Sequence, residues 1–448
     1  MYIDFLLDAF QTNQDKDAIV WHDQIFSYSW LLHAVQGWRK RLHEEGIAPG
    51  AVASLEADFS PNAIAGMLVL IEHGCIIVPL TASVETKKPE FREIAQVEVM
   101  LDVGKDDQVQ CQKTATVASH ELLWSLKRAQ RPGLVLFSSG STGKHKAAVH
   151  DFVPLLEKFK VPRHGLRTLT FLLFDHIGGV NTFLYTLSNA GCVVTVQDRT
   201  PDAVCTAIEK YRVQLLPTSP TFLNLLLLSE AYKRHDLSSL ETMTYGTEVM
   251  PESTLRRFHA LFPHIRLLQT YGLSEVGILR SKSKSSDSLW VKVGGEGFKT
   301  RVIDDMLEIK AQSAMLGYLN APSPFTEDGW FQTGDAVEVD GEYIRILGRK
   351  SEVINIGGEK VYPAEVESVL QLMNGVEGVI VSAESNPITG QMVMAKVKLH
   401  TGETLSAFRK RMQLFCQDKL PRFKIPQKVI IVTEEMHGER FKKMRNIA

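Results

Sequence analysis

Hydrophobic residues in the first part of the chain alternate between helical and strand spacing. Within residues 28–55, leucine, valine and tryptophan recur at helical intervals from Leu31 to Leu42, and Gly46 ends the pattern. Pro61 opens a second helical pattern, and residues 75–80 form a short β-like run. This rhythm predicts an α/β fold in which helices cover a mainly parallel sheet.

The same alternation continues through the middle of the chain. Apolar runs typical of buried strands occur at residues 134–137, 168–174, 192–196, 213–216 and 265–268. Helical patterns lie at residues 203–211 and from Pro251 onward. Residues 87–131 give weaker signals and no assignment. The basic, serine-rich residues 280–288 are expected to form an exposed loop.

The pattern changes after Leu307. Short strands and turns replace the earlier rhythm, and alternation over residues 336–347 around Asp340 and Gly341 predicts a hairpin. A helix from Pro363 is followed by strand, strand, helix and strand patterns at residues 376–383, 393–399, 405–419 and 429–432. We therefore expect a large N-terminal domain of mixed, mainly parallel sheets with helices and a β-rich subdomain. A small α+β C-terminal domain would follow it.

The bulk composition narrows the class of protein. A chain of 448 residues is longer than one hydrophobic core usually fills, so at least two domains are expected. Fifty Lys and Arg residues against 52 Asp and Glu residues give a net charge of -2, which argues against a nucleic-acid partner. The most apolar run, residues 66–80, is interrupted by Glu72, His73 and Pro79 and is too short for a membrane span.

The N-terminus and the cysteines bear on location and redox state. Residues 1–10 carry Asp4 and Asp8 but no basic leader, which argues against a signal peptide. The five cysteines are widely spaced, and none lies at Cys-x-x-Cys or metal-ligand spacing. We expect reduced, mostly buried thiols and a cytoplasmic protein.

The most distinctive local signal is the turn after the strand at residues 134–137. It reads Ser138, Ser139, Gly140, Ser141, Thr142, Gly143, Lys144, His145 and Lys146. Hydroxyls, backbone N–H groups and lysines favour an anion, and the glycines allow a ligand to approach closely. The common NTPase loop is excluded because Ser138 stands at its first glycine. We expect a polyphosphate here, and a flexible surface turn is the alternative.

Two further strand-end loops carry polar side chains. Asp175, His176 and Gly178 follow the strand at residues 168–174, and ligands of α/β sheets gather beyond the carboxyl ends of strands. Glu275 ends another such loop, where a carboxylate beside hydroxyls can hold Mg²⁺ that bridges phosphates. A structural turn with a satisfied histidine and a solvated glutamate are the alternatives at this point.

The β-rich part adds a candidate sugar site. Asp335, after a Thr-Gly turn, could accept hydrogen bonds from two ribose hydroxyls, and Arg349 could reach the same sugar or a phosphate. The alternative is an ordinary turn aspartate and a surface arginine. Gly357 and Gly358 form a tight loop that exposes its backbone. The polar, basic tail from Glu434 has the composition of a frayed terminus.

Six motifs in order resemble those of the adenylate-forming ligases. They are SSGSTGKHK, YGLSE, FQTGD, the Gly348-Arg349 turn, INIGGEKVYPAEVE, and Lys442 three residues before Arg445. The resemblance runs from about Phe26 to the end, and an ordered set is specific where a single motif is weak. This superfamily includes acyl-CoA synthetases, aryl-CoA ligases, carrier-protein-loading adenylation domains and luciferases. Its fold implies an N-terminal domain at residues 1–349 and a mobile C-terminal lid domain at residues 350–448.

The resemblance implies roles for individual residues. Ser138 to Lys146 would grip the triphosphate, Gly246, Thr247 and Glu248 would lie against adenine, and Tyr271 with Gly272 would pack at the nucleotide. The other nucleotide contacts would be Ser274 to phosphate, Glu275 to Mg²⁺, and Asp335 with Arg349 to ribose. Lys442 would bridge the carboxylate and the α-phosphate. The acid would meet Asp175, His176 and Gly178, and the thiol tunnel would pass Gly357 and Gly358.

Members of this superfamily run two half-reactions. A carboxylate attacks the α-phosphate of MgATP to give acyl-AMP and pyrophosphate, and then the small domain rotates and a thiol attacks the acyl carbon. The resemblance thus implies an acid-thiol ligase that uses ATP and Mg²⁺, with a small carboxylic acid and CoA as substrates. One alternative is a stand-alone enzyme that loads a phosphopantetheine thiol on a separate carrier protein, since no carrier domain follows Lys442. A non-catalytic nucleotide-binding protein is the other.

The chain departs from the usual motifs at several positions. His145 and Ala147 replace Pro and Gly around the last lysine of the phosphate loop, and Ser351 replaces the usual Asp or Lys hinge. Phe441 stands where Gly usually precedes the catalytic lysine, and the adjacent Lys443 is a second candidate for that role. Asp175 falls near the position at which amino-acid-activating relatives have an aspartate for the substrate amine. It would either recognise an amino or hydroxy substituent or brace its own loop.

Overall fold

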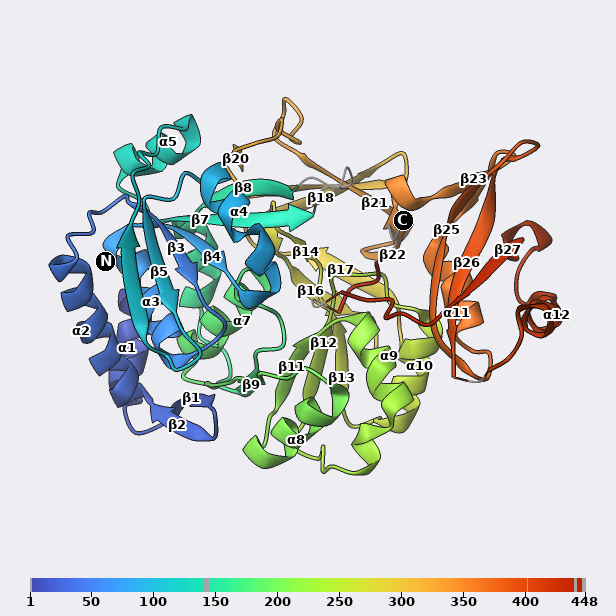
Figure 1. The fold of residues 1–448 in the computed structure, drawn as a ribbon, viewed down its shortest axis with the longest axis horizontal. Helices are drawn as coiled ribbons and strands as arrows, with labels where there is room; N and C mark the ends of the chain where they lie inside the picture. Colours follow the sequence, from blue (N-terminus) through green and yellow to red (C-terminus); the bar gives the residue numbers. More distant parts are fainter. Residues whose placement is uncertain (1, 140–144, 401, 439–440, 445–448) are drawn as a thin grey trace.

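The computed structural model describes residues 2–139, 145–400, 402–438 and 441–444. Two seven-stranded sheets, a six-stranded antiparallel sheet and a C-terminal five-stranded sheet form the frame of this part of the chain (Figure 1). The expected architecture, a large α/β N-terminal part with a β-rich subdomain and a small α+β C-terminal part, is confirmed.

The first sheet is parallel apart from its edge strand β2. Its order is β13-β12-β11-β9-β10-β1-β2. The strands are β1 (Asp17–Trp21), β2 (Gln24–Ser27), β9 (Arg167–Leu169), β10 (Cys192–Val194), β11 (Leu215–Thr218), β12 (Thr242–Tyr245) and β13 (Arg266–Gln269). Thr218 pairs with Tyr245, and Tyr245 pairs with Gln269. The loops after β11, β12 and β13 therefore begin side by side.

The second sheet has a parallel centre and antiparallel edges. Its order is β20-β8-β7-β4-β3-β5-β6. The strands are β3 (Val52–Glu56), β4 (Ile76–Leu80), β5 (Val99–Val103), β6 (Val109–Lys113), β7 (Gly133–Ser139), β8 (His145–Asp151) and β20 (Gly317–Tyr318). Residues 87–131, which gave no clear sequence signal, supply β5, β6 and two helices.

Helices cover both sheets. They are α1 (Asp4–Thr12), α2 (Tyr28–Glu44), α3 (Pro61–His73), α4 (Lys88–Ile94), α5 (Glu121–Ala129), α6 (Phe152–Leu156), α7 (Ile177–Ser188), α8 (Pro201–Tyr211), α9 (Pro220–Ser229) and α10 (Glu252–Leu261). Three 3₁₀ turns lie among them, at Ala82–Lys87, Glu157–Lys160 and Ala231–Lys233. One buried cluster joins α1, α2, α3 and α7 to both sheets, and a second joins α8, α9 and α10 to the first sheet. The helical spacing at Leu31, Val35 and Leu42 reflects burial of one face of α2.

An antiparallel sheet forms the β-rich subdomain. Its order is β16-β17-β22-β21-β19-β18. The strands are β16 (Arg280–Ser283), β17 (Trp290–Gly294), β18 (Phe298–Ile303), β19 (Met306–Ala311), β21 (Phe331–Asp340) and β22 (Tyr343–Arg349), beside a small ribbon of β14 (Gly272–Leu273) and β15 (Gly277–Ile278). The expected hairpin joins β21 to β22, and Gly341 adopts a φ of +60° in its turn. The prediction of an exposed loop at residues 280–288 is wrong for residues 280–283, because they pair with β17.

The C-terminal part has a sheet and a core of its own. After the 3₁₀ turn Lys350–Glu352, its elements are β23 (Ile354–Ile356), β24 (Glu359–Val361), α11 (Pro363–Leu370), β25 (Val376–Asn386), β26 (Gly390–Leu399), α12 (Leu405–Cys416), the 3₁₀ turn Arg422–Lys424 and β27 (Lys428–Val432). Val366, Leu370 and Phe408 are buried in its core. Figure 1 shows this part at one end of the molecule.

Strand β9 ends at Leu169, although the apolar run that predicted it continues to Phe174. The residues beyond Leu169 leave the sheet but stay buried, with Phe171 at 2% and Phe174 at 0% exposure. Phe174 packs against Phe59 and Phe183 in the core between the two sheets. The second half of this apolar run forms a buried loop beyond the sheet. Sequence spacing does not distinguish such a loop from a buried strand.

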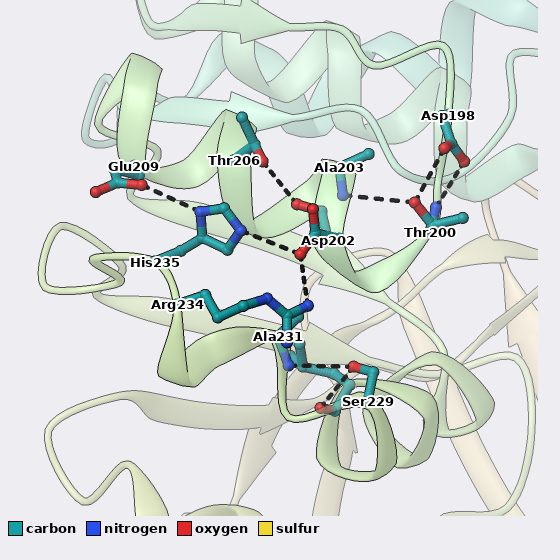
Figure 2. A network of polar contacts seen from close by, with 11 residues as sticks. Asp198, Thr200, Asp202, Ala203, Thr206, Glu209, Ser229, Ala231, Arg234 and His235 are labelled. Carbon is teal, nitrogen blue, oxygen red and sulfur yellow. Dashed lines mark hydrogen bonds and ion pairs between the residues drawn. The ribbon is translucent and has the colours of Figure 1, made fainter.

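A polar network ties α8 to the connection after α9 (Figure 2). Asp202 of α8 accepts a hydrogen bond from Arg234 at 2.6 Å, and His235 lies 3.2 Å from Asp202 and 3.1 Å from Glu209. The Arg234 hydrogen bond is the main cause of a lowered pKa of Asp202. Thr200 caps α8 by accepting from Ala203 N at 3.4 Å. These contacts brace the helical layer over the first sheet.

Within the described parts of the chain, no helix combines the length and apolar character needed to cross a bilayer. The five cysteines are free thiols, as expected, and Cys75, Cys192, Cys205 and Cys416 are buried, while Cys111 is partly exposed. Burial raises the pKa of Cys416 to about 11.

Candidate active site

The ends of β11, β12 and β13 bring two of the expected nucleotide loops together. Thr270 N donates to Tyr245 O at 2.8 Å, and Gly246 N donates to Thr218 O at 3.3 Å. A Cβ at Gly246 would lie 2.7 Å from Thr270 O, so only glycine fits there. Sequence order separates these loops, and the register of the parallel strands places them in contact.

The loop after β12 holds a strained residue and a desolvated carboxylate. Thr247 has a φ of +71°, which is rare for a β-branched residue and is typical of functional loops. Both Glu248 carboxylate oxygens accept from Thr221 Oγ1 at 3.0 Å. Burial raises the pKa of Glu248, and the positive charge of Lys443 opposes this rise. Glu248 is thus held in place from α9.

Asp335 is the centre of a second polar group. The Tyr271 hydroxyl donates to Asp335 Oδ2 at 2.5 Å, and Arg349 Nε lies 2.7 Å from Asp335 Oδ1. Burial raises the pKa of Asp335, and the Arg349 charge opposes it. Burial followed by the charge of Asp335 raises the pKa of Tyr271 well above its usual value. The two partners fix the orientation of the carboxylate, and each oxygen keeps a second lone pair for a ligand hydroxyl.

Glu275 lies beside this group. Its Oε1 accepts from the Tyr318 hydroxyl at 2.7 Å, and its backbone oxygen accepts from Met315 N at 2.7 Å. The charge of Glu275 contributes to the raised pKa of Asp335. No group of three or more His, Cys, Asp and Glu side chains in the described residues could hold a metal ion. One carboxylate suits an ion such as Mg²⁺, which keeps waters and takes phosphate oxygens.

Ser274, in the same loop, is fixed through its backbone. His150 Nε2 donates to Ser274 O at 2.6 Å, and the His150 side chain is fully buried. Burial lowers the pKa of His150 to about 4. His150 is therefore neutral at pH 7 and carries its proton on Nε2.

The phosphate loop is described at its two ends only. Ser138 pairs with Lys146 and Ser139 pairs with His145, where β7 meets β8. Residues 140–144, which include the expected ligands Gly140, Ser141, Thr142 and Gly143, lie outside the described residues. Lys146 Nζ lies 5.2 Å from the centre of the Tyr318 ring. Because Tyr318 also binds Glu275, the phosphate loop and the expected Mg²⁺ ligand share one neighbour.

The loop before α7 orients His176. His176 is the N-cap of α7, and its Nδ1 accepts from Gly178 N at 3.0 Å. A Cβ at Gly178 would approach Leu172 Cδ1 to 2.7 Å and His176 Nδ1 to 3.1 Å. In its neutral form, His176 therefore carries its proton on Nε2. Asp175 is buried, and its Oδ2 accepts from Thr81 Oγ1 at 2.9 Å, so it braces this loop against the connection after β4.

Lys442 reaches the same place from the far end of the chain. A small cavity is lined by Phe171, Leu172, Leu173, His176, Arg199, Thr247 and Lys442. The neighbouring Lys443 is engaged elsewhere, since its Nζ lies 2.6 Å from Glu367 Oε2 of α11. The description of the tail as a frayed terminus is wrong for residues 441–444, because Phe441 contacts Phe171 and Ser219 and Lys443 pairs with Glu367.

Gly357 and Gly358 are not part of this arrangement. They form the turn between β23 and β24 with φ values of +58° and +99°. A Cβ on either glycine would meet no atom within 4 Å, so backbone conformation and not space selects glycine there. Figure 1 shows β23 in the C-terminal part, apart from the ends of β11, β12 and β13.

Several side chains that support the site gave no signal in the sequence. Thr221, Tyr318 and His150 each hold a motif residue from a distant element. Glu367 lies within the quoted INIGGEKVYPAEVE stretch, but helix spacing shows only the apolar stripe of α11. Arg199 precedes the cap of α8 and looks like a loop residue in sequence.

Comparison with known proteins shows that this chain is similar to several CoA ligases. Indoleacetate–CoA ligase of Aromatoleum aromaticum is 28% identical, with 94% of this chain and 92% of the relative covered. A feruloyl-CoA synthase of Amycolatopsis is 26% identical over 66% of this chain and 65% of the relative. Among solved structures, the anthranilate CoA ligase AuaEII in complex with anthranoyl-AMP has a TM-score of 0.79 at 17% identity, with 97% and 93% covered.

The amide bond synthetase McbA from Marinactinospora thermotolerans has the same fold, with a TM-score of 0.77, 21% identity, and 99% and 98% of the two chains covered. The model of the AMP-binding enzyme family matches residues 6–305, and that of the AMP-binding enzyme C-terminal domain matches residues 365–443. The chain therefore belongs to the AMP-binding enzyme family of adenylate-forming ligases, as its ordered motifs predicted.

Proposed function

We propose that this protein is an AMP-forming acid-thiol ligase that activates a small carboxylic acid with MgATP and transfers the acyl group to CoA. The observation that carries the proposal is the meeting of Lys442 with His176 and Thr247 in one cavity. These three residues come from the C-terminal tail, the α7 cap and the β12 loop. They place a cation and a hydrogen-bond donor where the nucleotide loops end.

In the first half-reaction, a carboxylate oxygen bonds to the α-phosphorus of ATP, and the bond from this phosphorus to pyrophosphate breaks. This step needs positioning and charge neutralisation more than a protein nucleophile. Lys442 would neutralise the carboxylate and the α-phosphate, and the Nε2 proton of His176 would orient the acid. Ser138, Ser139 and Lys146, with the loop between them, would hold the leaving pyrophosphate.

The nucleotide would lie across the ends of β12 and β13. Asp335, held by Tyr271 and Arg349, would accept from the ribose hydroxyls. Gly246, Thr247 and Glu248 would flank adenine, Gly272 would pack at the nucleotide with Tyr271, and Ser274 would contact a phosphate. Glu275 would hold Mg²⁺, which supplies positive charge to the phosphate oxygens when it is bound.

Asp175 and Gly178 would shape the acid pocket next to His176. The Thr81 hydrogen bond supports a bracing role for Asp175, and recognition of an amino or hydroxy substituent is the second candidate. If Asp175 binds an amine, Asp175→Ala should raise KM for amino-bearing acids alone. Equal effects on all acids would exclude this role.

In the second half-reaction, the thiol sulfur bonds to the acyl carbon, AMP leaves with the bonding electron pair, and the thiol proton passes to solvent. Strand β23, which precedes the Gly357-Gly358 turn, lies in the C-terminal part, apart from the ends of β11, β12 and β13 (Figure 1). We therefore infer a second arrangement, in which residues 350–448 rotate about Ser351 relative to residues 1–349 and bring this turn to the thiol. The CoA ligases among the relatives favour CoA over a carrier-bound phosphopantetheine as acceptor.

A pyrophosphate-exchange screen over fatty, aryl and amino acids tests the first half-reaction. Thioester formation with CoA, measured for each active acid, tests the second. Exchange with no CoA turnover would favour a separate carrier protein as acceptor. No exchange with any acid would contradict the ligase proposal and favour a non-catalytic nucleotide-binding protein.

A further inference from the structure

The tail that carries Lys442 is folded back on itself. His437 and Lys443 form an antiparallel bridge, and Met444 N donates to Met436 O at 3.0 Å. Phe441 N donates to Gly438 O at 2.9 Å and has a φ of +50°. This left-handed conformation suits glycine and is unfavourable for a residue with a side chain. Phenylalanine at this position therefore needs compensating contacts.

The ring of Phe441 supplies such contacts. Its centre lies 5.1 Å from that of Phe171 and 5.7 Å from that of Phe222, and it stacks on His437 at 5.2 Å. Phe171 and Phe222 are 2% and 0% exposed and belong to the core of the first sheet and its helices. The C-terminal tail is thus joined to the N-terminal part through an aromatic cluster.

Ser219 adds a polar contact at the same point. Its hydroxyl donates to Phe441 O at 2.8 Å and accepts from Phe222 N at 3.1 Å as the cap of α9. Ser219 is fully buried. One hydroxyl therefore links the start of α9 to the residue before Lys442.

We propose that Phe441 is a positioning residue for acyl adenylation, which anchors the tail so that Lys442 stays beside His176 and Thr247. This inference rests on the proposed function. Lys442 follows Phe441 directly, so a loose tail would distribute its ammonium group over many positions. The reaction would then lose the advantage of a fixed charge. The contacts of the Phe441 ring and carbonyl with the N-terminal part offset the conformational cost of its positive φ.

Three variants of Phe441 and one control separate the contribution of its ring from that of its backbone conformation. Phe441→Ala removes the ring but keeps a Cβ at positive φ, and Phe441→Gly removes both. Phe441→Leu keeps an apolar side chain. Phe415→Ala removes a partly buried ring that packs on the C-terminal core away from the N-terminal part. Pyrophosphate exchange and thioester formation from supplied acyl-AMP are measured for each variant.

We expect Phe441→Ala to lower the kcat of pyrophosphate exchange about tenfold, with a smaller effect on the KM for ATP. Phe441→Gly should lose less than Phe441→Ala, because only glycine tolerates the left-handed backbone. Phe441→Leu should retain more activity than both. Thioester formation from supplied acyl-AMP should fall less than exchange does in all three. Phe415→Ala should change exchange by less than about twofold.

Three activity results would overturn the inference. They are wild-type exchange in Phe441→Ala, a larger loss in Phe441→Gly than in Phe441→Ala, and equal losses in both half-reactions. Amide hydrogen exchange provides a readout that does not depend on activity. The Met444 amide should exchange faster in Phe441→Ala than in Phe415→Ala, and unchanged protection would also overturn the anchor. A wild-type protein inactive with every acid would contradict the proposed function, while this amide measurement would still test the anchor.

Discussion

Replacing Lys443 with methionine would test how the tail is held against the C-terminal part. Lys443 Nζ lies 2.6 Å from Glu367 Oε2, and the two side chains are 14% and 1% exposed. Glu367 Oε1 also accepts from Val381 N at 2.9 Å. Removing one partner of a buried ion pair costs about 3 kcal/mol or more. We expect about 2 kcal/mol here, because Lys443 keeps some contact with water.

The double variant Lys443→Met/Glu367→Gln shows whether this cost belongs to the pair. With both charges removed, no carboxylate is left buried beside an apolar side chain, and the glutamine oxygen can still accept from Val381 N. The double variant should therefore be less destabilised than the sum of the single variants, by about 1 kcal/mol or more. Urea unfolding of the wild type and the three variants measures this coupling. Additive losses would show that Lys443 and Glu367 do not interact.

Activity measurements on Lys443→Met and on Lys442→Ala separate the roles of the two tail lysines. Lys443→Met should lower the rate of pyrophosphate exchange, because it loosens the tail, but it should leave measurable activity. Lys442→Ala should abolish exchange but spare thioester formation from supplied acyl-AMP, since its charge acts in adenylation alone. Equal loss of both half-reactions in Lys442→Ala would mean that the role belongs to another residue.

Two further expectations follow from buried polar groups. Tyr271→Phe removes a hydrogen bond to the Asp335 carboxylate and should raise the KM for ATP about tenfold, measured by exchange at varied ATP; an unchanged KM would exclude Asp335 from the nucleotide site. His150 binds fewer protons folded than unfolded, because burial lowers its pKa to about 4. Stability should therefore fall as pH is lowered from about 6.5 toward 4, by about 3 kcal/mol in total. Urea unfolding at several pH values should show a flatter dependence for His150→Asn, and an equally steep one would refute this assignment.

Local patterns were sufficient where one element decides the outcome. The apolar spacing from Leu31 to Leu42 predicted α2 because a surface helix buries one face whatever lies beneath it. The hairpin at Gly341 followed from turn chemistry and from alternation in the flanking strands. Spacing failed at Phe171 and Phe174, since a buried loop and a buried strand have the same apolar content.

Motif order located the loops of the site, but their supporting contacts depend on distant residues. Asp335 and Arg349 face each other across a hairpin, so their pairing was accessible from local sequence. Thr221, Tyr318 and Glu367 reach motif residues from other elements, and no local pattern marks a side chain for a long-range contact. The packing of α9, β20 and α11 against the rest of the fold sets these neighbours.

The C-terminal tail shows most clearly which properties the sequence determines and which depend on the tertiary structure. Its residue order placed a lysine after Phe441 and predicted a role for it, while its basic composition indicated a frayed end. The motif favoured Lys442, which lies three residues before Arg445, and left the adjacent Lys443 as a second candidate. Folding separates them: Lys443 pairs with buried Glu367, and Lys442 lines the cavity with His176. Phe441, the residue before Lys442, packs on Phe171 and Phe222, and such packing exists only once the first sheet and α9 have formed.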